Sequence, residues 1–302
     1  MTMRILIISN PAAGQRGSSL LQQVMASLEA RDAAVSHIAT RCAGELEKIV
    51  NNVSANDWDR IVIAGGDGSL KEAVNGWSES TPPIGLIPIG TANVVSLELG
   101  LPAKPDALAD LILQGTTRQI CVPETNGRRF VFCAGAGFDA CLVASVSGHL
   151  KKHLGKLAFV IAAFRALKCC RFPRLDIVVD GVTYKGAGVI IMNGSLYGGP
   201  YNVAPGRQLS DPVFSVIVLT DPGAWSAITY STAMLRGRLH KHSGVRFIPS
   251  ATSVDVTGPR GVAYHTDGDI ADIQALHARA DSCRVHLIAP PRQPATRGSS
   301  YR

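Results

Sequence analysis

A run of glycines follows an apolar stretch in the first quarter of the chain. Residues 61–64 (IVIA) are apolar, residues 65–69 (GGDGS) follow them, and residues 70–77 have the apolar spacing of a helix. Glycines allow backbone N–H groups to approach a polyphosphate closely, and the start of a helix adds partial positive charge. The spacing matches neither the Walker A pattern nor the dinucleotide pattern GxGxxG, so a tight strand-to-helix turn without a ligand stays an open alternative.

Two further turns of this type follow other apolar stretches. Residues 10–14 (NPAAG) come after residues 4–8, and residues 88–93 (PIGTAN) come after residues 84–87. The carboxyl ends of neighbouring parallel strands lie at one edge of a sheet, and this edge is where ligands bind. Three such turns in one sheet therefore favour a nucleotide crevice.

The turns are positioned by alternating strands and helices, which indicate a mainly parallel, three-layer α/β domain. The strands are expected at 4–8, 35–39, 61–64 and 84–87, and the helices at 18–30, 44–52, 70–77 and 106–114. From residue 119 onward the pattern changes to short alternating apolar runs, at 130–134, 175–179, 186–192 and 213–219, with a single helix at 150–168. We therefore predict an α/β plus all-β fold.

The division of the chain follows from this change of pattern. We expect an α/β nucleotide-binding domain at residues 1–120 and a β-rich domain at residues 121–289. Residues 290–302 are rich in Pro, Arg and Ser, and they form a tail that either returns to the first domain or is disordered.

The three turns, with Glu72 and the pair Asn75-Gly76, resemble the catalytic domain of the diacylglycerol kinase family in type and order. The resemblance to the soluble bacterial lipid kinases of that family covers nearly the whole chain. NAD kinases share the GGDG turn, but their downstream Asn-Asp-Ala-Glu segment is missing here. The resemblance implies a domain like those of NAD kinase and phosphofructokinase, joined to a β-sandwich-like domain. It also implies transfer of the γ-phosphate of ATP to a hydroxyl group of a membrane lipid, with a diacylglycerol-like lipid as the first choice.

The resemblance also implies which residues bind ATP. They are Asn10, Thr40, Gly65, Gly66, Asp67, Gly68, Ser69, Glu72, Gly90, Thr91 and Asn93. Asp67 is expected to help organise Mg²⁺, the cofactor that accompanies ATP, because a carboxylate is tolerated among phosphates mainly when a cation offsets it. A capping role for Asp67 at the start of the following helix is the alternative.

Residues 265–269 (HTDGD) resemble the family's Asp-Gly-Glu segment, whose acid accepts the proton of the lipid hydroxyl. By position this role falls to Asp269, with Asp267 beside it. Asp replaces the family's Glu here, which shortens the reach of the carboxylate by one methylene group. A solvated acidic turn is the alternative.

A structural Mg²⁺ site is implied by a third resemblance, in residues 198–213. In the bacterial relatives this segment holds the ion through positions that match Gln208, Asp211 and Val213. Only one of these supplies a carboxylate, and Pro212 replaces the family's Gly, so an ordinary turn stays open as an alternative.

Between residues 149 and 175 the chain has seven Lys or Arg and no acid, with leucines at helical spacing. A basic amphipathic helix of this kind suits peripheral contact with an anionic membrane, although packing of its apolar side on the β-rich domain explains the pattern as well. The longest apolar run there, residues 157–164, is far shorter than the roughly 20 residues that span a bilayer.

The net charge of +7 suits nucleic acid or an anionic membrane, but the sequence has no nucleic-acid module, so we expect no nucleic-acid partner. The cysteines form no C-x-x-C pair and residues 1–10 are too short for a signal peptide, which favours a cytoplasmic protein, peripheral on the inner face of the membrane. A regulatory lipid- or nucleotide-binding protein without turnover, and a kinase of a sphingoid or other lipid, are the alternatives. No serine lies in a G-x-S-x-G context, so a covalent enzyme intermediate is not expected.

Overall fold

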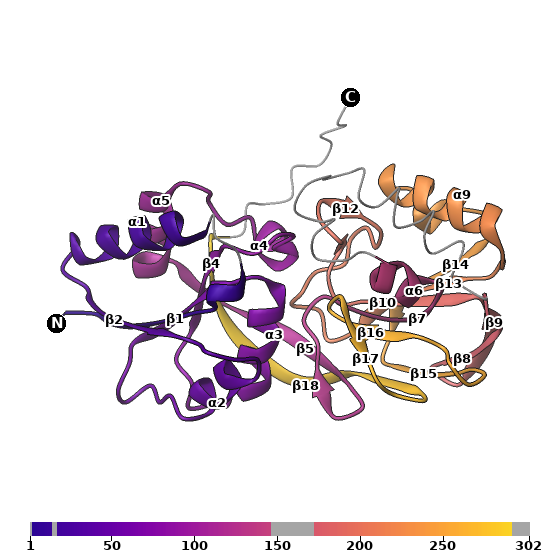
Figure 1. Cartoon of the computed structure of the whole chain (residues 1–302), viewed down its shortest axis with the longest axis horizontal. Coiled ribbons are helices and arrows are strands. Elements are labelled where there is room, and N and C mark those ends of the chain that lie inside the picture. The colour runs from indigo at the N-terminus through magenta and orange to yellow at the C-terminus, as the bar shows by residue number, and fades with distance from the viewer. Residues whose placement is uncertain (1, 14–16, 146–171, 292–302) are drawn as a thin grey trace.

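The chain has two lobes that face each other across a cleft (Figure 1). The structure is a computed structural model that describes residues 2–13, 17–145 and 172–291. The first lobe consists of β1 (Arg4–Ser9), η1 (Pro11–Ala13), α1 (Gly17–Glu29), β2 (Ala34–Ala39), α2 (Glu45–Asn51), β3 (Arg60–Gly65), α3 (Asp67–Gly76), β4 (Ile84–Pro88), α4 (Val94–Leu99) and α5 (Pro105–Gln114).

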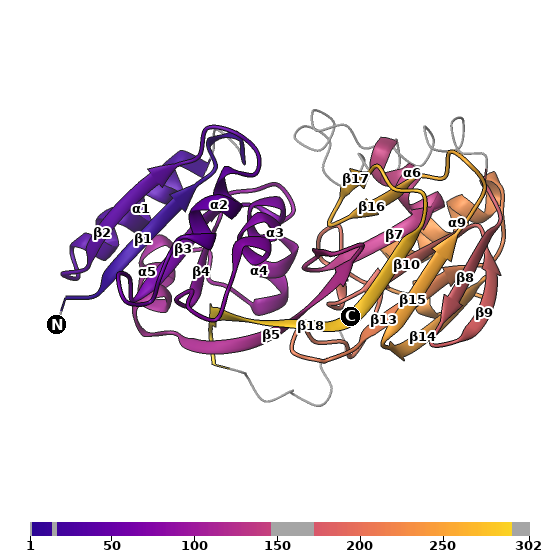
Figure 2. The ribbon, with the colours of Figure 1, turned by 90° about the horizontal axis from the view of Figure 1, so that it is seen from below.

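The second lobe is mostly β-structure. Its elements are β6 (Arg128–Arg129), β7 (Cys133–Gly137), α6 (Phe138–Ser145), β8 (Leu175–Val179), β9 (Val182–Gly186), β10 (Gly188–Met192), β11 (Leu196–Tyr197), β12 (Tyr201–Asn202), β13 (Phe214–Leu219), α9 (Ala224–Leu235), η2 (Leu239–Lys241), β14 (Val245–Ala251), β15 (Ser253–Thr257), β16 (Tyr264–Thr266) and β17 (Asp269–Ala271). Two long strands, β5 (Thr116–Thr125) and β18 (Leu276–Ala289), run between the lobes (Figure 2).

The inner strands of the sheet of the first lobe, β1, β3 and β4, are buried on both faces, whereas the edge strand β2 is mostly exposed. Strands β2, β1, β3 and β4 are parallel neighbours in that order. Along β1, Ile5 and Ile7 pack with α1 and α5, while Leu6 and Ile8 pack with α2 and α3 on the opposite face. Because every residue of this strand after Arg4 is buried, the strand is mostly apolar, and the three-layer α/β domain is confirmed.

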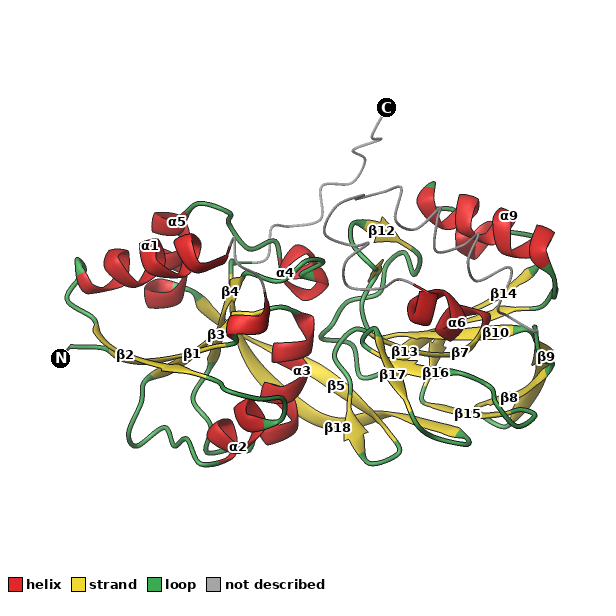
Figure 3. Ribbon diagram, viewed as in Figure 1, coloured by secondary structure: helices red, strands yellow, loops and turns green. Residues whose placement is uncertain are grey.

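The second lobe is a β-sandwich with helices outside it (Figure 3). A six-stranded antiparallel sheet has the order β14-β13-β10-β7-β16-β17, and it packs on β8 and β15 through alternate apolar residues such as Ile177, Val189 and Val256. The predicted all-β character is confirmed, but the prediction of a single helix is wrong. Both α6 and α9 are helices of the described residues, and their short, mostly apolar sequences gave no clear helical period. The predicted helix at 150–168 lies outside the described residues.

The lobes share one continuous sheet. Strand β18 pairs with β4 in the first lobe and with β15 in the second, and it pairs with β5 from Ala278↔Thr125 to Ala289↔Thr116. The predicted domain boundary near residue 120 falls inside β5. No helix of the described residues is long and apolar enough to cross a membrane.

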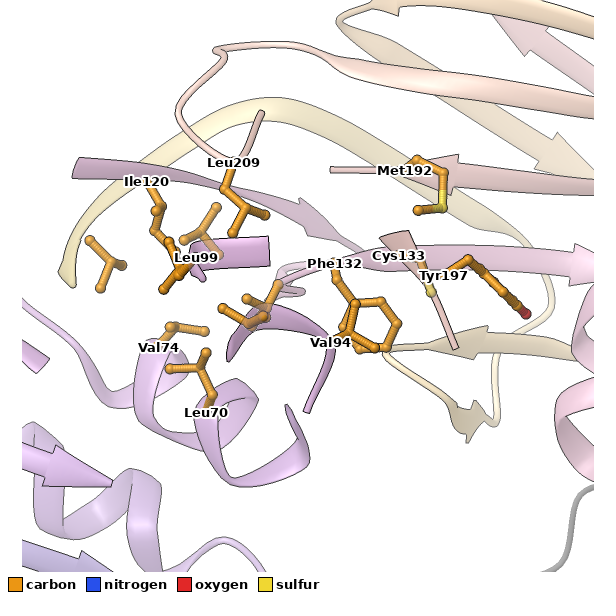
Figure 4. Close-up of a cluster of buried hydrophobic side chains, with 14 of the residues drawn as sticks. Leu70, Val74, Val94, Leu99, Ile120, Phe132, Cys133, Met192, Tyr197 and Leu209 are labelled. Carbon is orange, nitrogen blue, oxygen red and sulfur yellow. The ribbon is translucent and has the colours of Figure 1, made fainter. Parts of the chain in front are cut away.

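A second connection between the lobes is apolar. Leu70 and Val74 of α3 and Val94 of α4 belong to one buried cluster with Phe132 and Met192 of the second lobe (Figure 4). Helix α4 was not predicted, because six residues are too few to show a helical period.

We expect the α2–α3 contact to tolerate no side chain at Gly76. A Cβ atom there would lie 2.2 Å from the carbonyl oxygen of Glu47, which is backbone and cannot move aside. Gly76→Ala should therefore lower the free energy of unfolding by about 1–3 kcal/mol. Gly68→Ala is the matched control, because no atom lies within 4 Å of a Cβ there and alanine favours a helix. Denaturant titration of both variants measures the difference, and equal stabilities would contradict the expectation.

Candidate functional site

The three glycine turns lie side by side at one edge of the first sheet. Strands β1, β3 and β4 end together, with Ser9 opposite Ala64 and Gly65 opposite Pro88. The turns are also hydrogen-bonded to one another: the N–H of Asn10 donates to the Ala64 carbonyl, and the N–H of Ile89 donates to the Gly65 carbonyl. The structure therefore brings together the segments that the sequence predicted to form one crevice.

Two glycines of different turns touch through their backbones. A Cβ atom on Gly90 would lie 2.4 Å from the Cα of Gly66, and one on Gly66 would lie 3.1 Å from the Cα of Gly90. Neither position has room for a side chain. The edge therefore presents backbone groups to the cavity, as phosphate recognition by N–H groups requires.

Asp67 connects the glycine turns to the next helix. Its carboxylate accepts hydrogen bonds from the N–H groups of Val94 (2.9 Å) and Val95 (3.1 Å), the first two residues of α4. The capping role considered for this residue is therefore present, but on α4 rather than on α3, where Asp67 is the first residue. Its position after Gly66 leaves the carboxylate in the lining of the crevice.

The eleven residues predicted to bind the nucleotide, Asp67 among them, divide into two groups. Eight of the set line a single cavity of about 1200 Å³: Asn10, Gly66, Asp67, Gly68, Ser69, Glu72, Gly90 and Thr91. Thr40, Gly65 and Asn93 do not line it. Thr40 is buried and donates its hydroxyl to the Ser9 carbonyl, while Asn93 fastens its own turn by donating to the carbonyls of Pro88 and Gly90.

The opposite wall of the cavity comes from the second lobe and is partly apolar. It contains Phe132, Leu142, Val143, Tyr197, Tyr201 and the turn at 267–269. Asp269, the predicted proton acceptor, therefore faces the same space as the glycine turns. Its side chain is 67% exposed.

Lys71 crosses from the first lobe to this acidic turn. It lies on α3, and its ammonium group is 3.2 Å from Oδ2 of Asp269, 2.9 Å from Oγ1 of Thr266 and 3.1 Å from the Thr266 carbonyl oxygen. Lys71 was not predicted from the sequence, because its contact joins positions almost two hundred residues apart.

Asp267 is buried and serves a different purpose from its neighbour Asp269. Its carboxylate accepts the N–H groups of Val131 (2.7 Å), Phe132 (2.9 Å) and Cys133 (3.1 Å). Burial raises its pKa from 3.8 to about 6, against these three donors and the charge of Lys71, which favour the ionised form. Asp267 thus holds the turn on which Asp269 lies.

A buried polar group lies beside the apolar wall. Asp139 on α6 accepts hydrogen bonds from the Tyr197 hydroxyl and the Nε2 of His265, both at 2.5 Å, and all three side chains are at most 4% exposed. Gly135 leaves room for it, since a Cβ there would lie 2.3 Å from Oδ2 of Asp139. Burial, together with the Asp139 charge, raises the pKa of Tyr197 and keeps its phenol protonated. Asp139 and Tyr197 could not be predicted as a pair with His265, because each looks like an ordinary core position in the sequence.

The guanidinium group of Arg207 lies at the position predicted for the structural metal ion. The guanidinium Nη1 of Arg207 donates to Oδ2 of Asp211 (3.3 Å) and to the Val213 carbonyl (3.1 Å). The N–H of Gln208 donates to the same Asp211 oxygen (3.0 Å). The residues present do not fit Mg²⁺ at Gln208, Asp211 and Val213, because an ion between these oxygens would meet the positive charge of Arg207. The predicted basic helix of residues 149–175 lies almost entirely outside the described residues.

Comparisons with known proteins were made for the whole chain. The model of the diacylglycerol kinase catalytic domain matches residues 4–124, and that of the YegS C-terminal NAD kinase beta sandwich-like domain matches residues 133–286. A diacylglycerol kinase of Bacillus subtilis (strain 168) is 31% identical over 295 residues, which cover 95% of this chain and 96% of that protein. A diacylglycerol kinase of Staphylococcus carnosus (strain TM300) is 27% identical over 274 residues, 89% of each chain. The crystal structure of a diacylglycerol kinase from Bacillus anthracis has the same fold, with a TM-score of 0.74, 23% identity and coverage of 95% of this chain and 97% of that one.

We expect the fold to need no divalent ion at Asp211. The midpoint of thermal unfolding without nucleotide should be the same in Mg²⁺ and in EDTA, because the Arg207 guanidinium already neutralises the carboxylate. Arg207→Ala should lower the free energy of unfolding by roughly 2–4 kcal/mol. The substitution leaves the Asp211 carboxylate without its counter-charge and the Val213 carbonyl without the donor that Arg207 supplies. Arg246→Ala, at an exposed position of β14, is the control. A wild-type midpoint that falls on chelation would contradict the assignment.

Asp267 should make stability depend on pH. Between the unfolded pKa of 3.8 and the folded pKa of about 6, the native state keeps a proton that the unfolded state has released. The free energy of unfolding therefore falls as pH rises from about 4 to about 7, by at most roughly 3 kcal/mol from this group. Asp267→Asn lowers stability at every pH but should remove this slope, which urea titrations at several pH values measure. An unchanged slope in the variant would show that another group titrates.

Proposed function

This chain belongs to the diacylglycerol kinase family, and from this premise we propose that it transfers the γ-phosphate of ATP to a hydroxyl group of a membrane lipid, with a diacylglycerol-like lipid as the first candidate. The observation that carries the proposal is a cavity of about 1200 Å³ that both lobes line. Its first wall has the backbone chemistry that phosphates require, and its second wall has an acid beside apolar side chains. One space is therefore suited to both substrates of such a transfer.

The donor phosphates would lie against the backbone of Gly66, Gly68 and Gly90. The N–H groups there and at the start of α3 stabilise negative charge without any need to reorganise. Mg²⁺ bound with ATP would offset the charge of the phosphates, with Asp67 as the carboxylate placed to hold it. The N–H donors from α4 fix the orientation of that carboxylate before any ligand binds.

The acceptor hydroxyl would lie at Asp269. As the oxygen attacks the γ-phosphorus, its proton passes to a carboxylate oxygen of Asp269, the new O–P bond forms, and the bond from phosphorus to the bridging oxygen breaks so that ADP leaves. The Asp269 side chain lines the cavity and is mostly exposed, which supports this role because a hydroxyl group entering the cavity can approach the carboxylate.

The lipid would reach the site along the apolar part of the second wall. Leu142 and Val143 of α6 and Tyr201 of β12 supply surface for acyl chains, while the glycerol end reaches the acidic turn. The protein would act from the cytoplasm, with the membrane as the source of the acceptor. A peripheral position on the inner face follows from this proposal.

Transfer of labelled γ-phosphate from ATP with Mg²⁺ tests the proposal. We expect a diacylglycerol in mixed micelles to be labelled, in a panel that also holds a sphingoid base and phosphatidylglycerol. Asp269→Asn should lower kcat about 100-fold or more while ATP binding changes little, because the variant removes the proton acceptor alone. Asp67→Asn should weaken both ATP binding and turnover.

Asp272→Asn is the matched control, since this acid lies just after β17 and does not line the cavity. ATP binding with no lipid labelled in the panel would favour the alternative of a regulatory binding protein. Full activity in Asp269→Asn would contradict the role of Asp269 and leave the kinase activity standing.

A further inference from the structure

The only ion pair recorded between the glycine-turn helix and the acidic turn, within the described residues, is that of Lys71 with Asp269. Lys71 lies on α3, four residues after Asp67, and its side chain is 18% exposed. Asp269 begins β17 in the other lobe. The contact therefore spans the cleft at the place where the two proposed substrates would meet.

The ammonium group of Lys71 is held by three oxygen atoms of different kinds. A lysine has three N–H donors, and here the acceptors are the Thr266 carbonyl (3.1 Å), the Thr266 hydroxyl (2.9 Å) and the Asp269 carboxylate (3.2 Å). Thr266 and Asp269 are opposite each other in the β16–β17 hairpin, so Lys71 donates hydrogen bonds to both strands of that hairpin. A flexible side chain is thereby fixed at its charged end.

Asp269 itself has little else to fix it. The side chain is short and mostly exposed, and a carboxylate on an exposed hairpin samples several rotamers. Transfer of a proton requires the acceptor atom within hydrogen-bonding reach of the hydroxyl, and a displacement of about 1 Å can cost a hundredfold in rate. A cation on the rigid α3 helix would select the rotamer that points towards the glycine turns.

We propose that Lys71 is a positioning residue, which holds the Asp269 carboxylate towards the glycine turns and so sets the acceptor hydroxyl in line with the donor phosphate. This inference rests on the proposed function for its catalytic meaning. This positioning also accounts for Asp in place of the family's Glu at position 269, because attraction to the Lys71 ammonium group holds the shorter side chain towards the glycine turns.

A double-mutant cycle tests the inference. Lys71→Met should lower kcat about 10- to 100-fold, with the KM for ATP changed little, because the lysine acts through Asp269. In the Asp269→Asn background the same substitution should change kcat by less than about twofold, since the group that it positions is already disabled. Lys71→Arg should retain part of the activity that Lys71→Met loses, because arginine keeps the positive charge but presents it on a larger, planar group.

Lys48→Met, an exposed lysine on the neighbouring helix α2, is the control for loss of a lysine and should leave kcat unchanged. If the losses of kcat from the two substitutions multiply in the double variant, and Lys71→Met raises the KM for ATP, the inference is overturned. Lys71 would then bind the nucleotide independently of Asp269. Wild-type kcat in Lys71→Met would overturn it too, while leaving the proposed kinase activity intact.

A measurement without substrate separates the ion pair from the activity. Lys71→Met should lower the thermal unfolding midpoint of the wild type more than that of the Asp269→Asn variant, because the partner charge is missing in the latter. If the wild type labels no lipid, the proposed function fails and this midpoint difference still reports whether the pair exists. Equal shifts in both backgrounds would remove the contact on which the inference rests.

Discussion

The pairing of β5 with β18 holds the rest of the structure in place. The two strands are antiparallel neighbours over most of their length, and β18 also pairs with β4 in one lobe and with β15 in the other. Backbone hydrogen bonds therefore cross from lobe to lobe without a flexible linker. This sheet, together with the apolar cluster between the lobes, lets the glycine turns and the acidic hairpin face each other at short range.

Carboxylates do most of the fine positioning around the cavity. Asp67 holds the start of α4, Asp267 holds the turn at 131–133, and Glu98 at the far end of α4 accepts the N–H groups of Ser195 and Leu196 from the second lobe. In each case a negative charge is satisfied by backbone N–H groups, which are strong donors to an ionised acceptor. The loops around the site are therefore fastened by side chains whose loss would shift the backbone and not merely remove a charge.

The sequence predicted the parts of this molecule that have a strong local signal. The apolar strands that end in glycine turns were enough to predict the first lobe, its three layers and the edge at which the turns meet. The pattern of a buried strand and the preference of glycine for turns are local properties of the sequence. Helices α4, α6 and α9 were not predicted, because their short, mostly apolar sequences show no helical period. The partners of Lys71 and Asp139 were not predicted for another reason. These contacts join residues that are far apart in the sequence, and no residue type at one position encodes them.

The contact of Gly66 with Gly90 has a consequence for how this scaffold can diversify. A Cβ atom on Gly90 would lie 2.4 Å from the Cα of Gly66, so Gly90 cannot gain a side chain unless the two turns move apart, and this part of the glycine edge has little surface that can vary. The opposite wall is built from ordinary side chains such as Leu142, Val143 and Tyr201, each of which can be exchanged for a larger or smaller neighbour. Over evolutionary time, or in a redesign, such a molecule would keep the chemistry of its glycine edge and vary the chemistry of the opposite wall.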